Sequence, residues 1–287
     1  MRIGIESPAY LQYGVTEGAR RARDHGFDCF DYSNFIHTDT DFFGLPESEF
    51  EKELTRQRAL IAAEGIRVNQ AHAPWEMPVK CGTPEERAIK LEKASKAMRG
   101  TAYIGATDLV IHAIMPFGEN SPENPELMRD LNAEFMGKLA EVAKEYGVKH
   151  INIENLPFPQ LPINHTSQCL DFVRRMNRET NSDIFRVCLD TGHSNFCGES
   201  PADAVRMLGS YLGTLHVHDN DGTADSHRIP GQGTIDWDDF SDALAEIGFD
   251  GVLNFETMVS WDIPHGDERD RLERELALIG HKLAKNI

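Results

Sequence analysis

The chain has few positive charges for its length, and this shortage limits what it can bind. Its 287 residues include 29 lysines and arginines against 47 aspartates and glutamates, a formal net charge of -18. A negative surplus of this size repels nucleic acids and anionic membrane surfaces at long range. We therefore expect neither as a partner, although net charge does not exclude a local metal-lined site.

Cysteine is scarce and shows no pairing pattern. The five cysteines are scattered and form no C-x-x-C pair: Cys29, Cys81, Cys169, Cys188 and Cys197. This argues against a disulfide framework and against a cysteine-based zinc site. Reduced thiols fit the pattern better, so we expect a cytoplasmic protein.

A long hydrophobic run is also missing. No uncharged stretch reaches the roughly 18 residues that a membrane-spanning helix requires. The opening segment MRIGIES starts directly on a strand-like run, without the features of a signal peptide. The sequence therefore predicts no membrane span.

The glycine-rich G-x-G-x-x-G loop of dinucleotide-binding folds is absent after the first strand-like run, where the chain reads PAYLQYG. Instead, short runs rich in β-branched and apolar residues recur at 2–6, 29–33, 67–73, 108–113, 150–156, 186–191, 214–219 and 252–257. Helical periodicity lies between them, most clearly at 49–65, 84–105, 125–147 and 267–285. Eight strands alternating with eight helices is typical of an α/β fold, the (β/α)8 TIM barrel. We expect residues 1–287 to form one such domain.

Polar and apolar residues alternate along the last four strand-like runs. In INIENL, Ile151 and Ile153 alternate with Glu154, and VCLD, TLHVH and VLNFE show the same pattern. Successive side chains of a strand point to opposite faces, so the apolar set should pack under the helices. The polar set should point into the barrel, at the face where barrel enzymes build their active sites. Its members at the strand ends are Glu154, Asp190, His216 and Glu256.

A divalent cation would explain why these four side chains share one mouth. A single glutamate at a strand end is more often an ion-pair partner or a helix cap. Three carboxylates and an imidazole on consecutive strands, however, repel one another unless a positive charge lies between them. An oxygen-rich set with one imidazole suits Mn²⁺ first, with Mg²⁺, Co²⁺ or Zn²⁺ as alternatives.

Further polar residues are expected near the same mouth. They are candidates either for substrate binding or for additional metal ions: His72, His112, His193, Asp225 and His227. Trp75 could stack on a sugar face, although aromatic residues near strand ends are as often loop anchors. Arg228 is one of the few cations expected near the mouth and is a weaker candidate for substrate binding.

The blocks NIEN, CLDTGH, LHVHDN, DSHRIPGQGTIDW and NFET, taken in order, resemble the signature blocks of the xylose isomerase-like TIM barrel superfamily. That grouping includes sugar phosphate isomerases and epimerases, ketose 3-epimerases, inosose dehydratase-type enzymes and nucleases of the endonuclease IV type. The resemblance extends over essentially the whole chain. It is specific for the superfamily and for a metal, and weak for the substrate.

The resemblance implies a metal-dependent sugar isomerase or epimerase of carbohydrate metabolism. Glu154, Asp190, His216 and Glu256 match the family's single catalytic metal site, in which the cation holds two adjacent oxygens of an open-chain sugar. Glu154 and Glu256 would be the catalytic pair: one removes a proton α to the metal-bound carbonyl, and the other returns it through an enediolate. His193 would contact a substrate oxygen. The implied partner is a small-molecule carbohydrate, and homo-oligomers are common among relatives.

The segment before the P-G-x-G turn departs from the epimerase pattern. The epimerase pattern has an arginine at the position where this chain has His227. In this chain Asp225 lies two residues before it. The Asp-x-His pair resembles endonuclease IV, in which nine histidines and carboxylates hold three zinc ions that cleave a phosphodiester. By that resemblance all nine positions are filled here with the same residue types: His72, His112, Glu154, Asp190, His193, His216, Asp225, His227 and Glu256. The acidic charge and the apolar, proline-rich loops favour a sugar enzyme. A three-zinc phosphodiesterase, a lyase or dehydratase acting on keto-sugars or inososes, and a sugar-binding module without activity are the alternatives.

Overall fold

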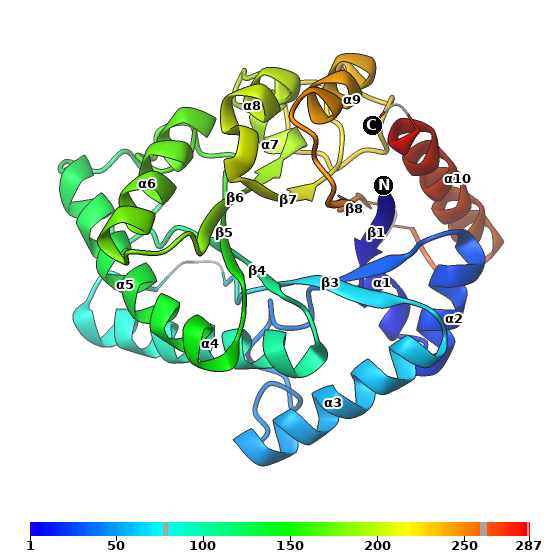
Figure 1. Ribbon diagram of the computed structural model, residues 1–287, viewed down its shortest axis with the longest axis horizontal. Helices are drawn as coiled ribbons and strands as arrows, with labels where there is room; N and C mark the ends of the chain where they lie inside the picture. Colours follow the sequence, from blue (N-terminus) through cyan, green and yellow to red (C-terminus); the bar gives the residue numbers. More distant parts are fainter. Residues whose placement is uncertain (77–79, 259–262, 286) are drawn as a thin grey trace.

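Eight parallel strands form a barrel in the computed structural model, which describes residues 1–76, 80–258, 263–285 and 287 (Figure 1). The strands are β1 (Arg2–Glu6), β2 (Cys29–Tyr32), β3 (Arg67–His72), β4 (Asp108–His112), β5 (His150–Glu154), β6 (Phe185–Asp190), β7 (Leu212–His216) and β8 (Val252–Phe255). From β1 to β7, each strand pairs with the next in sequence, and β8 pairs with β1. Between β7 and β8, a bridge joins Val217 to Phe255, and the Val217 amide donates to the Asn254 carbonyl at 2.7 Å. The predicted TIM barrel is confirmed.

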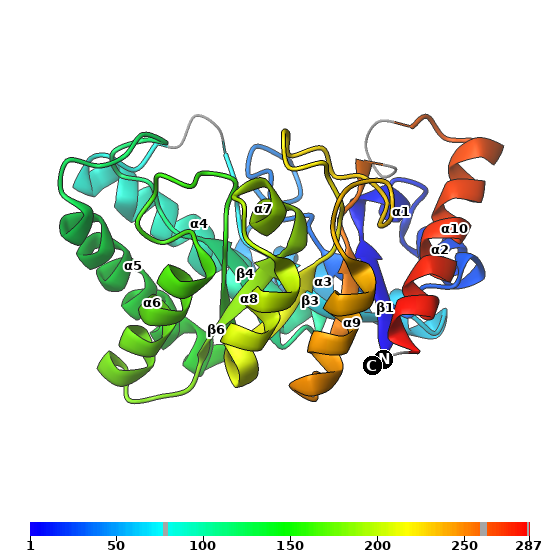
Figure 2. The same ribbon diagram turned by 90° about the horizontal axis from the view of Figure 1, so that it is seen from above.

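The helices lie outside the ring of strands (Figure 1). They are α1 (Pro8–Leu11), α2 (Val15–His25), α3 (Glu47–Ala63), α4 (Pro84–Ile104), α5 (Pro125–Tyr146), α6 (Thr166–Glu179), α7 (Thr191–Phe196), α8 (Pro201–Leu208), α9 (Trp237–Glu246) and α10 (Asp267–Ala284), with the 3-10 turn η1 (Gly209–Tyr211) before β7. The local signals for α4 are complete: Thr83 and Glu86 form a capping box, and Gly105 ends the helix with φ 87°. In the side view, the chain ends lie at the edge of the barrel opposite α1 and α7 (Figure 2).

The alternation predicted for the strands is present. Ile151, Ile153 and Phe255 are fully buried in the hydrophobic core, which lies between the strands and the surrounding helices. The barrel interior instead holds polar side chains such as Gln70 and Asn254, which are also fully buried. The Asn254 amide donates to Gln70 Oε1 at 2.6 Å. These polar layers fill the space beneath the mouth of the barrel.

The positions of the strands were predicted more accurately than the residues at which they end. Residues 217–219 were expected to extend the seventh strand, but β7 ends at His216 and the chain continues as a loop held by side chains. The segment that follows β6 is the short helix α7, which Asp190 caps by accepting from the His193 amide at 2.6 Å. No helix among the described residues is long and apolar enough to cross a membrane.

Asp219 organises the loop between β7 and α9. Its buried carboxylate accepts hydrogen bonds from the amides of Gly231 at 2.8 Å and Gly233 at 3.0 Å, and from Trp237 Nε1 at 2.9 Å. These bonds fix the P-G-x-G turn against the barrel and so fix the loop that carries Asp225 and His227.

Replacing Asp219 with alanine is expected to lower the free energy of unfolding by about 3 kcal/mol or more, because several buried donors lose their acceptor. Urea unfolding followed by circular dichroism measures the change. Asp221→Ala is the matched control, since Asp221 bonds to Thr223 and Arg228 near the surface and its loss should change the free energy of unfolding much less than the loss of Asp219. Equal losses in the two variants would contradict this role for Asp219.

Candidate active site at the carboxyl ends of the strands

A cavity of about 240 Å³ opens at the carboxyl ends of the strands. One part of its wall is apolar and consists of Ile36, Trp75, Leu156, Pro157 and Phe158; the other is polar and consists of His72, His112, Glu154, His193, Asp225, His227 and Glu256. Trp75 packs edge-on against the ring of His112, with 4.2 Å between ring centroids. A cavity with one apolar wall and one polar wall can bind a small molecule that has both kinds of surface.

The four residues predicted to converge do so at the base of this cavity. One ligand atom from each of Glu154, Asp190, His216 and Glu256 lies within 4.8 Å of the others. His216 Nδ1 lies 3.0 Å from Glu154 Oε1 and 2.9 Å from Glu256 Oε2. The register of the strands explains the convergence, because Asp190 and His216 are paired residues on β6 and β7.

The charges in this group are unbalanced. Burial opposes ionisation of Glu154, but interactions with His216 and His112 outweigh it and hold the pKa of Glu154 well below its usual range. Burial likewise opposes ionisation of Glu256, and His216 again lowers its pKa. Three carboxyl groups facing one imidazole in a buried site are a donor set that fits a divalent cation.

Two more histidines contact the opposite oxygen of Glu154. His112 Nε2 lies 2.9 Å and His72 Nε2 lies 3.2 Å from Glu154 Oε2. His72 Nδ1 also lies 2.7 Å from the carbonyl oxygen of Ala73. Burial lowers the pKa of His112 to about 4, so its imidazole is neutral at neutral pH. Glu154 is therefore shared by two groups of potential ligands, one on each of its oxygens.

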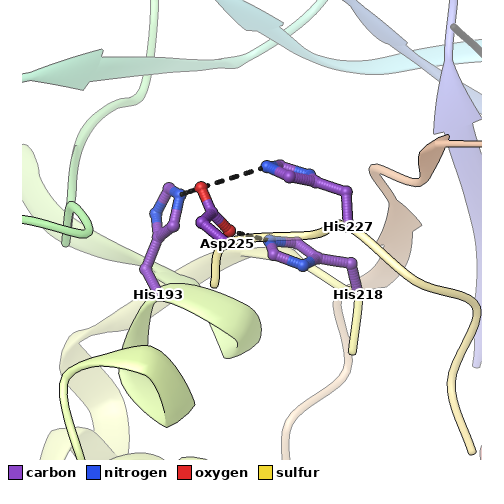
Figure 3. A group of neighbouring side chains, drawn as sticks. All are labelled: His193, His218, Asp225 and His227. Carbon is purple, nitrogen blue, oxygen red and sulfur yellow. Dashed lines mark hydrogen bonds and ion pairs between the residues drawn. The ribbon is translucent and has the colours of Figure 1, made fainter. Parts of the chain in front are cut away.

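A second cluster lies beside the first and contains His193, His218, Asp225 and His227 (Figure 3). Asp225 Oδ2 lies 3.1 Å from His193 Nε2 and 3.4 Å from His227 Nε2. The rings of His218 and His227 stack with 3.8 Å between centroids. His218 Nε2 lies 2.9 Å from Asp190 Oδ1, which joins the two clusters.

In the second cluster the histidines outnumber the carboxylates. Burial would lower the pKa of His193, but Asp190 and Asp225 outweigh it and raise the value to about 10. Burial also opposes the charge on His227, yet Asp225 raises its pKa to about 9. Both imidazoles are then protonated at neutral pH and outnumber the single carboxylate of Asp225. In the first cluster three carboxyl groups face one imidazole, so that cluster has the stronger demand for a cation.

The structure places most of the predicted site residues together. Eight of them, including Trp75, line the cavity. Asp190 and His216 lie buried beneath it. Arg228 is not brought to the cavity, because its guanidinium pairs with Asp221 at 2.7 Å. His218, which was not among the predicted site residues, contacts Asp190.

Two acidic residues of the site were not predicted. Asp31 at the end of β2 lies with Oδ2 3.0 Å from His216 Nε2. Glu6 at the end of β1 is buried, and burial together with the nearby Glu256 and Asp31 raises its pKa well above the usual range. A signal was present in each strand, since RIGIE and CFDY both place a carboxylate at or next to a strand end.

Comparisons with known proteins agree with this architecture. A family model described as xylose isomerase-like TIM barrel matches residues 19–279. The D-psicose 3-epimerase of Ruminiclostridium cellulolyticum is 31% identical over 50% of this chain and 50% of its own length. The L-ribulose 3-epimerase of Mesorhizobium japonicum is 26% identical over 90% of this chain and 82% of its own length. The chain thus spans only about half the length of the first of these two relatives.

A solved structure of D-psicose 3-epimerase with D-tagatose, from Clostridium cellulolyticum H10, superposes with a TM-score of 0.76. The match covers 99% of both chains at 22% identity, which is evidence for the fold alone. The relatives named above are epimerases.

Proposed function

The chain belongs to the xylose isomerase-like TIM barrel family, and on that premise we propose that it is a cation-dependent sugar epimerase or isomerase. One observation carries the proposal: Glu154 and Glu256 approach the same atom of His216, at the base of a cavity with one apolar wall. The names of the epimerase relatives support the same substrate class.

Glu154, Asp190, His216 and Glu256 would hold the cation, with Mn²⁺ the best match to an oxygen-rich set with one imidazole. When bound, the cation would polarise a substrate carbonyl and stabilise the negative charge that develops on it. Glu154, Asp190 and His216 are buried, and Glu256 is partly exposed where it lines the cavity.

The two glutamates would exchange the proton next to the carbonyl. Glu154 comes from β5 and Glu256 follows β8, so they approach the site from different strands. A carboxylate on one face of the substrate takes the proton and gives an enediolate, and a carboxyl group on the other face returns one. Return to the opposite face inverts the configuration at that carbon.

The cavity walls would position the sugar. The apolar side, with Trp75 and Phe158, can cover the carbon–hydrogen face of a sugar, while His193, Asp225 and His227 can bind its hydroxyl groups. Among the described lining residues there is no lysine or arginine. This favours a substrate without a phosphate group in the cavity.

A three-zinc phosphodiesterase is the second candidate, because the cluster of His193, His218, Asp225 and His227 could hold further ions. Elemental analysis of protein purified without chelator separates the two functions. We expect one divalent cation per chain and no incision of abasic DNA. About three zinc ions per chain, together with incision, would replace the epimerase by the nuclease.

Incubation with D-psicose, D-tagatose or L-ribulose in deuterated water tests the reaction itself. We expect one of these ketoses, or a related one, to be converted to its epimer with deuterium at the carbon next to the carbonyl. Formation of a dehydrated product would identify a lyase. Binding of a ketose without proton exchange would identify a sugar-binding protein.

A further inference from the structure

The imidazole of His216 has a partner on the side that faces away from the two glutamates. While Nδ1 lies near Glu154 and Glu256, Nε2 lies 3.0 Å from Oδ2 of Asp31. Asp31 is 1% exposed and comes from β2, which is not adjacent to β7 in the barrel. The contact therefore crosses the interior of the barrel and exists only because the barrel is closed.

Two amide side chains hold Asp31 in turn. Gln70 Nε2 donates to Asp31 Oδ2 at 2.7 Å, and Asn254 Nδ2 donates to Gln70 Oε1 at 2.6 Å. All three residues are at most 1% exposed. Asn254 on β8 thus donates to Gln70 on β3, and Gln70 donates to Asp31 on β2.

The direction of this chain of hydrogen bonds follows from its carboxylate end. Gln70 turns its amide nitrogen toward the Asp31 carboxyl oxygen, which accepts. Its oxygen then faces Asn254, which must donate. The oxygen of Asn254 is left facing Gly4, where a Cβ would lie 2.0 Å from it. Glycine at this position leaves the room that the chain of bonds requires.

We propose that Asp31 is a positioning residue that accepts a hydrogen bond from Nε2 of His216 and so leaves Nδ1 free to bind the cation. The inference rests on the proposed cation site. Metal-binding histidines generally donate their second N–H to a carboxylate or a carbonyl, which fixes the tautomer and the ring orientation. Asp31 is the acceptor that the geometry offers to His216, and Gln70 keeps that acceptor in place.

The test measures cation affinity rather than turnover. Metal-depleted protein is titrated with Mn²⁺, and the dissociation constant is obtained by calorimetry or from the free-ion resonance signal. Asp31→Asn keeps the shape of the side chain but can present either an oxygen or an amide to His216, so the tautomer is no longer fixed. We expect the dissociation constant to rise about 10- to 100-fold. The absorption spectrum of the Co²⁺-loaded variant should also differ from that of the parent.

Asp108→Asn is the matched control. Asp108 forms a similar pair with a histidine, His150, at 2.9 Å, but at the amino ends of β4 and β5. Its replacement should leave both the Mn²⁺ affinity and the Co²⁺ spectrum unchanged. The Asp108–His150 pair is only partly buried, so circular dichroism and thermal unfolding of both variants show whether each is folded before the affinities are compared.

The outcomes separate this inference from the proposed function. If the parent protein binds no divalent cation, the proposed function fails, and the inference fails with it. If the parent binds Mn²⁺ and folded Asp31→Asn binds it equally well with the same Co²⁺ spectrum, the inference is wrong and the cation site stands. Should Asp31→Asn fail to fold, Gln70→Leu is the second variant. It removes the donor that holds Asp31 and leaves Asp31 and His216 themselves unsubstituted. An unchanged affinity in folded Gln70→Leu would then overturn the inference, whereas a several-fold weaker affinity would support it.

Discussion

Glu154→Gln and Glu256→Gln are each expected to reduce kcat/KM for sugar epimerisation by about a thousandfold or more, because each variant lacks one of the two groups that exchange the substrate proton. Steady-state rates with the ketose that proves active in deuterated water measure the loss. Elemental analysis and circular dichroism of each variant show whether the cation and the fold are retained.

Proton exchange in the two variants should be asymmetric. If each glutamate serves one face of the substrate, a single variant can still remove the proton from one epimer but not from the other. Exchange followed separately from each epimer in deuterated water should therefore survive for opposite epimers in the two variants. Loss of exchange from both epimers in a cation-loaded variant would instead mean that the missing glutamate acts on both faces.

Glu179→Gln is the matched control for these variants. Glu179 is the last residue of α6 on the outside of the barrel and pairs there with Arg175 at 2.7 Å. This variant should keep the parent kcat/KM. Less than a tenfold loss in both Glu154→Gln and Glu256→Gln would contradict their catalytic role.

Removal of the divalent cation is expected to abolish epimerisation, and addition of Mn²⁺ to restore it, since the described lining of the cavity contains no lysine or arginine that could offset both the enediolate and the carboxylates. The same step should change stability. A ligand at a thousand times its dissociation constant stabilises the folded state by about 4 kcal/mol, so the melting temperature should fall on chelation and recover with Mn²⁺.

The cluster that holds the cation can be identified from the melting temperatures of two variants, Asp190→Asn and Asp225→Asn. Asp190 belongs to the first cluster and Asp225 to the second. We expect Asp190→Asn to lose the Mn²⁺-dependent rise in melting temperature and Asp225→Asn to keep it. The reverse result would place the cation in the second cluster instead of the first, and loss in both variants would place a cation in the second cluster as well.

Much of the fold and part of the site could be predicted from local sequence patterns. The alternation in INIENL, VCLD and VLNFE assigned Glu154, Asp190 and Glu256 to the interior, because side chains of a strand alternate between faces whatever the strand packs against. Strand positions were correct for the same reason. Two points stay predictions: residues 1–287 form one domain, and these side chains bind a metal.

Contacts made outside a strand's own pattern could not be predicted in this way. The loop that carries Asp225 and His227 depends on the hydrogen bonds collected by Asp219, and His227 has φ 43°, a backbone conformation that nothing in the local sequence requires. Arg228 was expected near the substrate, but Asp221 in the same loop draws its guanidinium away from the cavity.

The sequence by itself determined the alternation of strands and helices, the inward-facing polar residues and their place at the strand ends, since these depend on periods of a few residues. Only the tertiary structure decided that Asp31 meets His216 and that His218 meets Asp190. Asp31 and His216 are 185 residues apart in the chain. The distance between them is set by the closure of the barrel and by the size of the side chains inside it, and no local pattern records either.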